Sequence, residues 1–237
     1  MNKQAPHGFS LVELMVGLTL SLVVVLGLFA LYRNATRTTF GPGGAAPSAE
    51  LDAQLNNGLL AAQLSLQGAG FGIASASSAN HLLLLRDASM AVSNSQMTAA
   101  SGSTVAIGAV AAAGNALLWQ SNPLQASASS AYVCQGLYVD PQTHAVYRLE
   151  QPSCSNLAAQ WSGGQWTANT LIAPDLLDAS QALSITVGNA ASCWPFGASA
   201  NASGLATVGK VQVILSYGNS TRDSANSYAI CLPNFAS

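Results

Sequence analysis

Charged residues are scarce in this 237-residue chain. They make up 7% of it, whereas ordinary soluble domains carry about 25%. Lysine and arginine number 7 and aspartate and glutamate 9, so the formal net charge is −2. No run of like charges occurs, which argues against a nucleic acid or an anionic lipid surface as the partner. A surface of small neutral residues suits packing against other subunits, or secretion.

Recognisable catalytic and metal-binding motifs are also missing. None of the three histidines lies in a nucleophile-elbow or metal-pair motif; they are His7, His81 and His144. The stretch GPGG lacks the lysine of a phosphate-binding loop. Asp175 and Asp178 fit no EF-hand spacing, so helix capping or surface acidity explains them better than a calcium site. We therefore expect no enzyme activity, no cofactor and no metal.

The four cysteines are widely spaced, which disfavours a zinc site built from close pairs. All of them follow the apolar segment near the N-terminus. An even number on one side of such a segment favours two disulfides in an oxidising compartment. Three connectivities are possible. We prefer Cys134–Cys154 and Cys193–Cys231, because each pair would flank or close a local β unit.

A long apolar run occupies Leu14 to Tyr32, without charge or proline. As a helix rising about 1.5 Å per residue, it can cross a hydrocarbon core of about 30 Å. The run has no convincing cleavage site of the secretory type, so its simplest interpretation is a signal anchor with Lys3 inside. That interpretation leaves Glu13 unexplained, because an unpaired carboxylate at the margin of the membrane costs about 2–3 kcal/mol.

The residues GFSLVELM, from Gly8 to Met15, resemble the type IV prepilin signal G-F-[ST]-L-[IV]-E-x-[LM]. The resemblance implies that a membrane peptidase cuts after Gly8 and methylates the new N-terminal Phe9. It also implies that Glu13 meets the α-amino group of a neighbouring subunit in a filament. With a reference pKa of about 8, that amine is mostly protonated at neutral pH and neutralises the carboxylate in an apolar bundle.

We expect the following organisation along the chain: a leader at 1–8, a transmembrane and assembly helix at 9–40, a Gly/Pro linker at 41–47, a second helical segment at 48–72 and a periplasmic β-rich domain at 73–237. Two prolines and three glycines interrupt the helix in the linker. We favour a simple loop there over a hinge.

The second helical segment has one apolar face, with residues three or four positions apart: Leu51, Leu55, Leu59, Ala62 and Leu66. Ser48 is its expected N-cap, and Gly68, Gly70 and Gly72 end it. The ending QGAGFG resembles R-x-A-G-[YF]-x-G of PilW-type minor pilins, with Gln67 in place of the arginine. A glycine C-cap alone explains the same residues.

The remainder is predicted to be strands joined by loops. Runs of strand length lie at 81–86, 104–110, 116–120, 131–140, 145–150, 182–188, 210–218 and 227–233. The turn PQTH predicts a hairpin, with His144 in solvent. Loops are expected at 87–103, 121–130 and 189–208. Helix first and strands afterwards predict an α+β fold, with an antiparallel sheet packed on the helix, as in pilins.

Four tryptophans raise the alternative of a sticky binding surface: Trp119, Trp161, Trp166 and Trp194. The stretch WSGGQW, which contains Trp161 and Trp166, suits either an exposed tip or the edge of a small core. We prefer the core, where large aromatic residues are usually buried.

The resemblance implies a structural role, most like a PilW-type minor pilin that primes pilus assembly at the tip. Its expected partners are other pilins through the N-terminal helix, prepilin peptidase, the bacterial inner membrane and the assembly machinery there. The globular domain would face the periplasm and later the cell surface. The alternatives are a J-like minor pseudopilin of a type II secretion system and a ligand-binding domain on a signal anchor.

Overall fold

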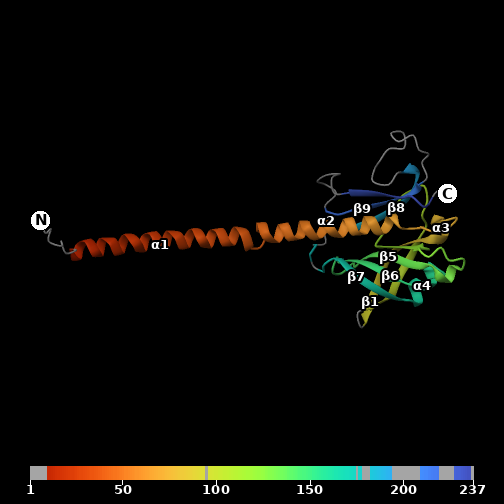
Figure 1. Ribbon diagram of the computed structural model, residues 1–237, viewed down its shortest axis with the longest axis horizontal. Helices are drawn as coiled ribbons and strands as arrows, with labels where there is room; N and C mark the ends of the chain where they lie inside the picture. Colours follow the sequence, from red (N-terminus) through yellow and green to blue (C-terminus); the bar gives the residue numbers. More distant parts are fainter. Residues whose placement is uncertain are drawn as a thin grey trace, which may run out of the picture. The chain divides into compact units, whose positions relative to one another are not determined.

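The computed structural model describes residues 10–93, 96–174, 176–177, 182–193, 209–218 and 227–235 (Figure 1). The chain divides into two compact units, one up to Ala53 and one from Gln54 onward. The described part of the first unit is helical apart from short turns, and the second unit contains all the described strands.

Helix α1 spans Leu11–Phe40, 30 residues, which corresponds to about 45 Å at 1.5 Å per residue. Its sequence is rich in leucine and valine and has no proline, so nothing interrupts the backbone ladder. The helix ends where the Gly41 N–H donates to Arg37 O at 2.9 Å.

A tight turn separates α1 from α2, and it depends on glycine. Gly43 has φ +73°, in the left-handed region that favours glycine. The Gly44 N–H donates to Gly41 O at 2.8 Å. A Cβ on Gly44 would lie 2.7 Å from Thr39 O, so a larger residue cannot occupy this position without a shift of the backbone.

Helix α2 spans Ala45–Gln67 and begins three residues before the predicted start. The prediction of Ser48 as the N-cap is therefore wrong. The Ser48 hydroxyl instead donates to Gly44 O at 2.9 Å within the first turn. Pro47 is accommodated because the first turn of a helix does not use its backbone N–H groups.

The predicted apolar face of α2 is confirmed for its part in the second unit, where Leu55, Leu59, Ala62 and Leu66 are buried. Gly58 is also buried, against strand β7 (Gln165–Ile172). A Cβ on Gly58 would lie 2.8 Å from Leu171 O. The absence of a side chain therefore lets the helix backbone approach the strand directly.

The segment QGAGFG ends α2, as predicted, and also ties it to distant parts of the unit. Gly70 has φ +75°, and its N–H donates to Gln120 O at 2.8 Å. The Asn122 N–H donates to Phe71 O at 2.7 Å. Near the C-terminus, Asn234 Nδ2 donates to Ala69 O at 2.8 Å. The glycines are therefore part of a docking point as well as a helix end.

The described strands form two antiparallel sheets. A closed barrel has the order β1-β2-β7-β6-β5-β4, with β1 Leu82–Ser93, β2 Gln96–Val105, β4 Ala116–Ser121, β5 Val133–Val139 and β6 Val146–Gln151. The second sheet has the order β10-β9-β8-β3, with β3 Ala112–Gly114, β8 Ser184–Cys193, β9 Gly209–Ser216 and β10 Ser227–Leu232. The α+β class is confirmed; the division into a barrel and a separate sheet was not predicted.

Three of the strands, β2, β3 and β7, were wholly or largely missed in the sequence. The expected loop at 87–103 lies mostly within the β1–β2 hairpin, and β7 follows a short helix, α4 (Leu157–Gly163). The strand expected at 104–110 ends at Val105. Most of β2 is exposed and composed of small residues (Ala, Gly, Ser and Thr), so it shows no clear alternation. It is a strand because its backbone groups pair with β1 and β7.

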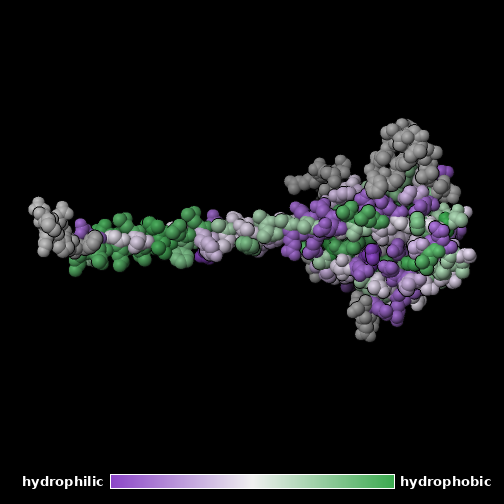
Figure 2. Space-filling model, viewed as in Figure 1, coloured by the Kyte–Doolittle hydropathy of each residue, from purple (hydrophilic) through white to green (hydrophobic). Residues whose placement is uncertain are grey.

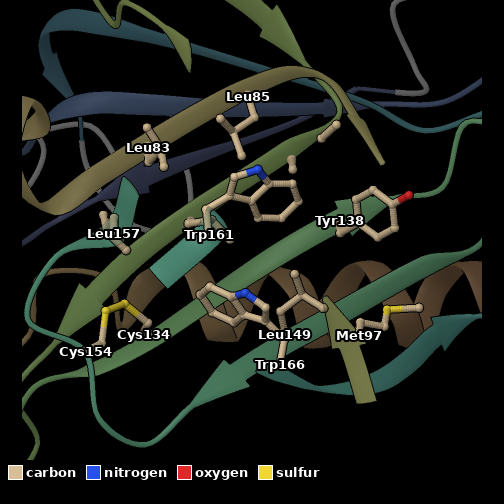
Figure 3. Packing of buried hydrophobic residues seen from close by; sticks show 13 residues of the cluster. Leu83, Leu85, Met97, Cys134, Tyr138, Leu149, Cys154, Leu157, Trp161 and Trp166 are labelled. Atoms are coloured by element: carbon tan, nitrogen blue, oxygen red, sulfur yellow. A yellow bond between two sulfur atoms is a disulfide. The ribbon is translucent and has the colours of Figure 1, made fainter. Parts of the chain in front are cut away.

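The barrel interior holds the core to which α4 contributes (Figure 3). Trp161 of α4 is 5% exposed and Trp166 of β7 is 0% exposed. They pack in one cluster with Leu85 and Leu149. The interpretation of WSGGQW as core rather than a sticky tip is therefore right, while Trp194 lies outside the described residues.

The structure joins the cysteines in sequential pairs. Cys134 of β5 is bonded to Cys154, with the two Cα atoms 5.4 Å apart. Cys193 of β8 is bonded to Cys231 of β10, at 5.5 Å. Both Cα separations lie in the usual range for disulfides. The second bond passes over β9 at Gly209, where a Cβ would lie 2.5 Å from the Cys231 Sγ.

Candidate functional site

The N-terminal end of α1 places Glu13 against its own backbone. Ser10 is the N-cap, and its N–H donates to Glu13 Oε2 at 3.0 Å. This arrangement is a capping box, which supplies a partner for one of the N–H groups at the helix start. A carboxylate there is also favoured by the positive end of the helix dipole. The S-x-x-E spacing predicts this role, which our sequence analysis missed.

Capping leaves the negative charge of Glu13 without a cation. Among the described residues the structure shows one ion pair, Arg148 with Glu150, which is remote from α1 in the sequence. Glu13 is exposed, and no other charged residue occurs between Leu11 and Tyr32. The carboxylate therefore meets no opposite charge within the described part of its own chain.

The surface of α1 is mostly apolar from Leu11 to Tyr32, as Figure 2 shows for the visible face, and becomes polar from Arg33 onward. None of its residues is buried, and its large side chains are exposed by 46% (Val25) to 75% (Leu11). Among the described residues, the helical stretch Leu11–Gln67 is the one long and apolar enough to cross a membrane. An apolar surface of this extent requires a cover of lipid or of other protein.

Polar groups inside the apolar stretch are satisfied by the helix itself. The Thr19 hydroxyl donates to Val16 O at 2.9 Å, and the Ser21 hydroxyl donates to Leu18 O at the same distance. Such back-bonding removes the need for outside partners in an apolar surrounding. The charge of Glu13 is therefore the main feature of this stretch that still needs neutralising.

The other predicted site residues are scattered. Gly8, Phe9, Asp175 and Asp178 lie outside the described residues. His144 is half-buried, and its Nδ1 lies 3.2 Å from Leu177 O, so the prediction of a solvated turn residue is wrong. Within the described ranges, no group of three or more potential metal ligands occurs.

His81 ends the short helix α3 (Ser78–His81), and its Nδ1 accepts from the Ser77 N–H at 3.1 Å. Burial lowers the pKa of His81 below 6.5. The unfolded chain therefore takes up this proton at a higher pH than the folded chain, so acidification through this range weakens folding.

We expect the thermal stability of the wild type to fall between about pH 7.5 and about pH 5.5, and His81→Asn to reduce that fall. Asparagine keeps an acceptor and does not titrate. Thermal unfolding at several pH values, with His144→Asn as the matched histidine control, measures the difference. An identical pH dependence in wild type and His81→Asn would contradict the expectation.

Comparison with protein families gives one match: the prokaryotic N-terminal methylation motif, at residues 3–29. The match covers Gly8, Phe9, Glu13 and most of the apolar run. No curated protein and no solved structure matches the chain. Pilin-family proteins with this motif are structural and typically not enzymes. The prepilin-type signal, followed by an apolar helix and an α+β domain, thus indicates a type IV pilin or pseudopilin-like subunit that is processed by prepilin peptidase.

Proposed function

We propose that this chain is a minor pilin of the PilW type, which helps to prime pilus assembly at the tip. The observation that carries the proposal is the stretch of α1 from Leu11 to Tyr32: it is strongly apolar, none of its residues is buried, and its one charged residue is Glu13. The segment QGAGFG, built into the fold through Gln120 and Asn122, supports the PilW type.

In this proposal Glu13 recognises a neighbouring subunit. The helix is anchored in the inner membrane until its apolar surface transfers from lipid to other helices. The α-amino group of a neighbour's processed N-terminus then supplies the missing positive charge. The capping bond from Ser10 holds the carboxylate at the helix start. An unpaired carboxylate in lipid costs about 2–3 kcal/mol, so its neutralisation biases the subunit toward assembly.

The proposed course of the chain follows from these parts. The leader, 1–8, is removed, and the segment that begins at Phe9 and contains α1 is the membrane and assembly segment. The glycine turn at 41–44 links it to α2, Ala45–Gln67. The domain at 73–237 faces the periplasm and then the cell surface. The pairs Cys134–Cys154 and Cys193–Cys231 support a location of this domain outside the cytoplasm, because disulfides persist in oxidising compartments.

Mass spectrometry of the mature N-terminus tests the processing step. We expect the purified chain to begin at N-methylated Phe9, because the resemblance of GFSLVELM to the prepilin signal implies a cut after Gly8. In cells that lack prepilin peptidase, the chain should retain its leader and its unmethylated Phe9. A mature chain that begins at any other residue would refute the proposed signal.

A J-like minor pseudopilin of a type II secretion system is the second candidate, because it shares the methylation motif and the fold class. Cross-linking in cells and identification of the proteins that co-purify with the full chain separate the two. Other minor pilins are expected. Pseudopilins in their place would move the assignment to the secretion system, and a solitary chain would favour a tethered ligand-binding domain.

A further inference from the structure

A cavity of about 300 Å³ lies at one end of the barrel. The start of β1, the end of β4 and the residue before β5 surround it, and neighbouring strands bring them together: Leu82 pairs with Trp119, and Gln120 with Cys134. The turn η1 (Ser129–Ala131) and the residues before α4 complete its wall. Its volume is at the lower end of the range for small-molecule pockets, roughly 300–1,000 Å³.

The lining is polar and carries no formal charge. None of its 12 residues is aspartate, glutamate, lysine or arginine. The polar members provide amides, hydroxyls, an imidazole and a phenol: Asn80, His81, Gln120, Ser129, Tyr132, Ser155 and Asn156. A charged ligand would find no counter-charge among these residues, and a purely apolar one would leave their polar groups without partners.

Several of these groups are held in place by bonds to the backbone. Gln120 is 3% exposed, and its Nε2 donates to Cys154 O at 2.8 Å. Asn156 Oδ1 accepts from the Ala159 N–H at 3.0 Å, which leaves its Nδ2 as a donor. His81 accepts at Nδ1, so the neutral ring carries its proton on Nε2. The cavity thus combines a buried, fixed amide with further oriented donors.

The cavity also offers a surface for the non-polar face of a ligand. Tyr132 lines it, together with Leu82, Leu83 and Leu157. Tyrosine combines an apolar ring with a polar tip. A ligand that matches both the polar groups and the apolar surface of the cavity has many hydroxyls, no charge and a face of C–H groups.

We propose that this cavity binds a neutral sugar unit. Sugar hydroxyls both donate and accept hydrogen bonds, which suits a lining of amides, hydroxyls and a neutral imidazole. The C–H face of a sugar ring packs on the Tyr132 ring. This activity is additional to assembly and does not depend on it.

The test uses the full mature chain in a zwitterionic detergent without a sugar headgroup, because alkyl glycosides would compete for the cavity. The probes are methyl glycosides of glucose, galactose, mannose and N-acetylglucosamine, the corresponding free sugars, and sialic acid as a charged comparison. Saturation-transfer NMR detects binding, and titration gives its strength. We expect at least one neutral sugar to bind with a dissociation constant on the order of 1 mM, and sialic acid to bind at least about tenfold more weakly.

Two variants locate the site, and a third is their control. Ala158→Phe fills the cavity from α4, and Tyr132→Ala removes its aromatic ring. Ala159→Phe adds the same side chain one position along α4, at an exposed residue that does not line the cavity. We expect the first two to weaken binding by at least about tenfold, equivalent to about 1.4 kcal/mol. The control should bind like the wild type, and the thermal transition of each variant checks that it folds.

Equal binding of a methyl glycoside and its free sugar would support the end of a glycan as the natural ligand. Binding of the free sugar alone, without binding of its methyl glycoside, would support a soluble sugar as the natural ligand. The proposal is overturned if no neutral sugar saturates the wild type, if sialic acid binds as well as the neutral sugars, or if Ala158→Phe and Ala159→Phe bind alike.

Discussion

Glu13→Gln is expected to remove the chain from pili almost as completely as Glu13→Ala, with both variants still inserted in the membrane. Glutamine keeps an oxygen that can accept from the Ser10 N–H, so the capping box survives, whereas alanine loses both the cap and the charge. If charge pairing with a neighbour's amine drives assembly, loss of the charge is decisive. Loss of a cap costs only about 0.5–2 kcal/mol.

Immunoblots of sheared pili and of membranes measure the result. We expect each Glu13 variant to fall at least about tenfold in the pilus fraction, a change equivalent to about 1.4 kcal/mol in docking, and to stay constant in the membrane. Glu50→Gln, which removes an exposed acid from α2, is the matched control. Wild-type incorporation of Glu13→Gln would show that Glu13 acts as a helix cap and not as a charge partner.

Gly209→Ala should destabilise the second sheet by interfering with the Cys193–Cys231 bond. The bond joins β8 to β10 across β9, and a Cβ on Gly209 would lie 2.5 Å from one sulfur and 3.1 Å from the other. Loss of a native disulfide typically costs about 2–5 kcal/mol. Thiol titration of the unfolded chain and denaturant unfolding measure the fraction oxidised and the free energy of unfolding.

A double-mutant cycle identifies the cause of the Gly209→Ala effect. In a chain that carries Cys193→Ser and Cys231→Ser, the alanine should cost much less than in the wild type, because the two changes act on one contact. Gly108→Ala is the control, since a Cβ there meets no atom within 4 Å. Full oxidation of Gly209→Ala together with wild-type stability would contradict the expectation.

Features carried by neighbouring residues could be predicted well. The apolar helix depends on side chains a few positions apart, and the hairpin on the turn between β5 and β6, which pair from Cys134↔Gln151 to Val139↔Val146. The burial of Leu55, Leu59 and Leu66 follows from their helical spacing. In each case the interacting residues are close together in the sequence.

Features that depend on distant pairing were missed or only half predicted. Strand β2 has little apolar pattern, and it pairs with β7 far along the chain, Gln96 with Thr167. The same holds for His144, whose Nδ1 lies 3.2 Å from Leu177 O. Such contacts leave no regular spacing in the sequence.

The sequence by itself determined the prepilin signal, the apolar helix with its lone acid and the α+β class. These are local patterns, set by hydrophobic spacing and by short motifs that a peptidase or a membrane can read in an extended or helical chain. Only the tertiary structure decided the closure of the barrel, the passage of the disulfide over Gly209 and the uncharged cavity beside Gln120. Each of these requires backbone groups and side chains from remote segments to meet, and their partners are chosen by packing and hydrogen bonding in three dimensions.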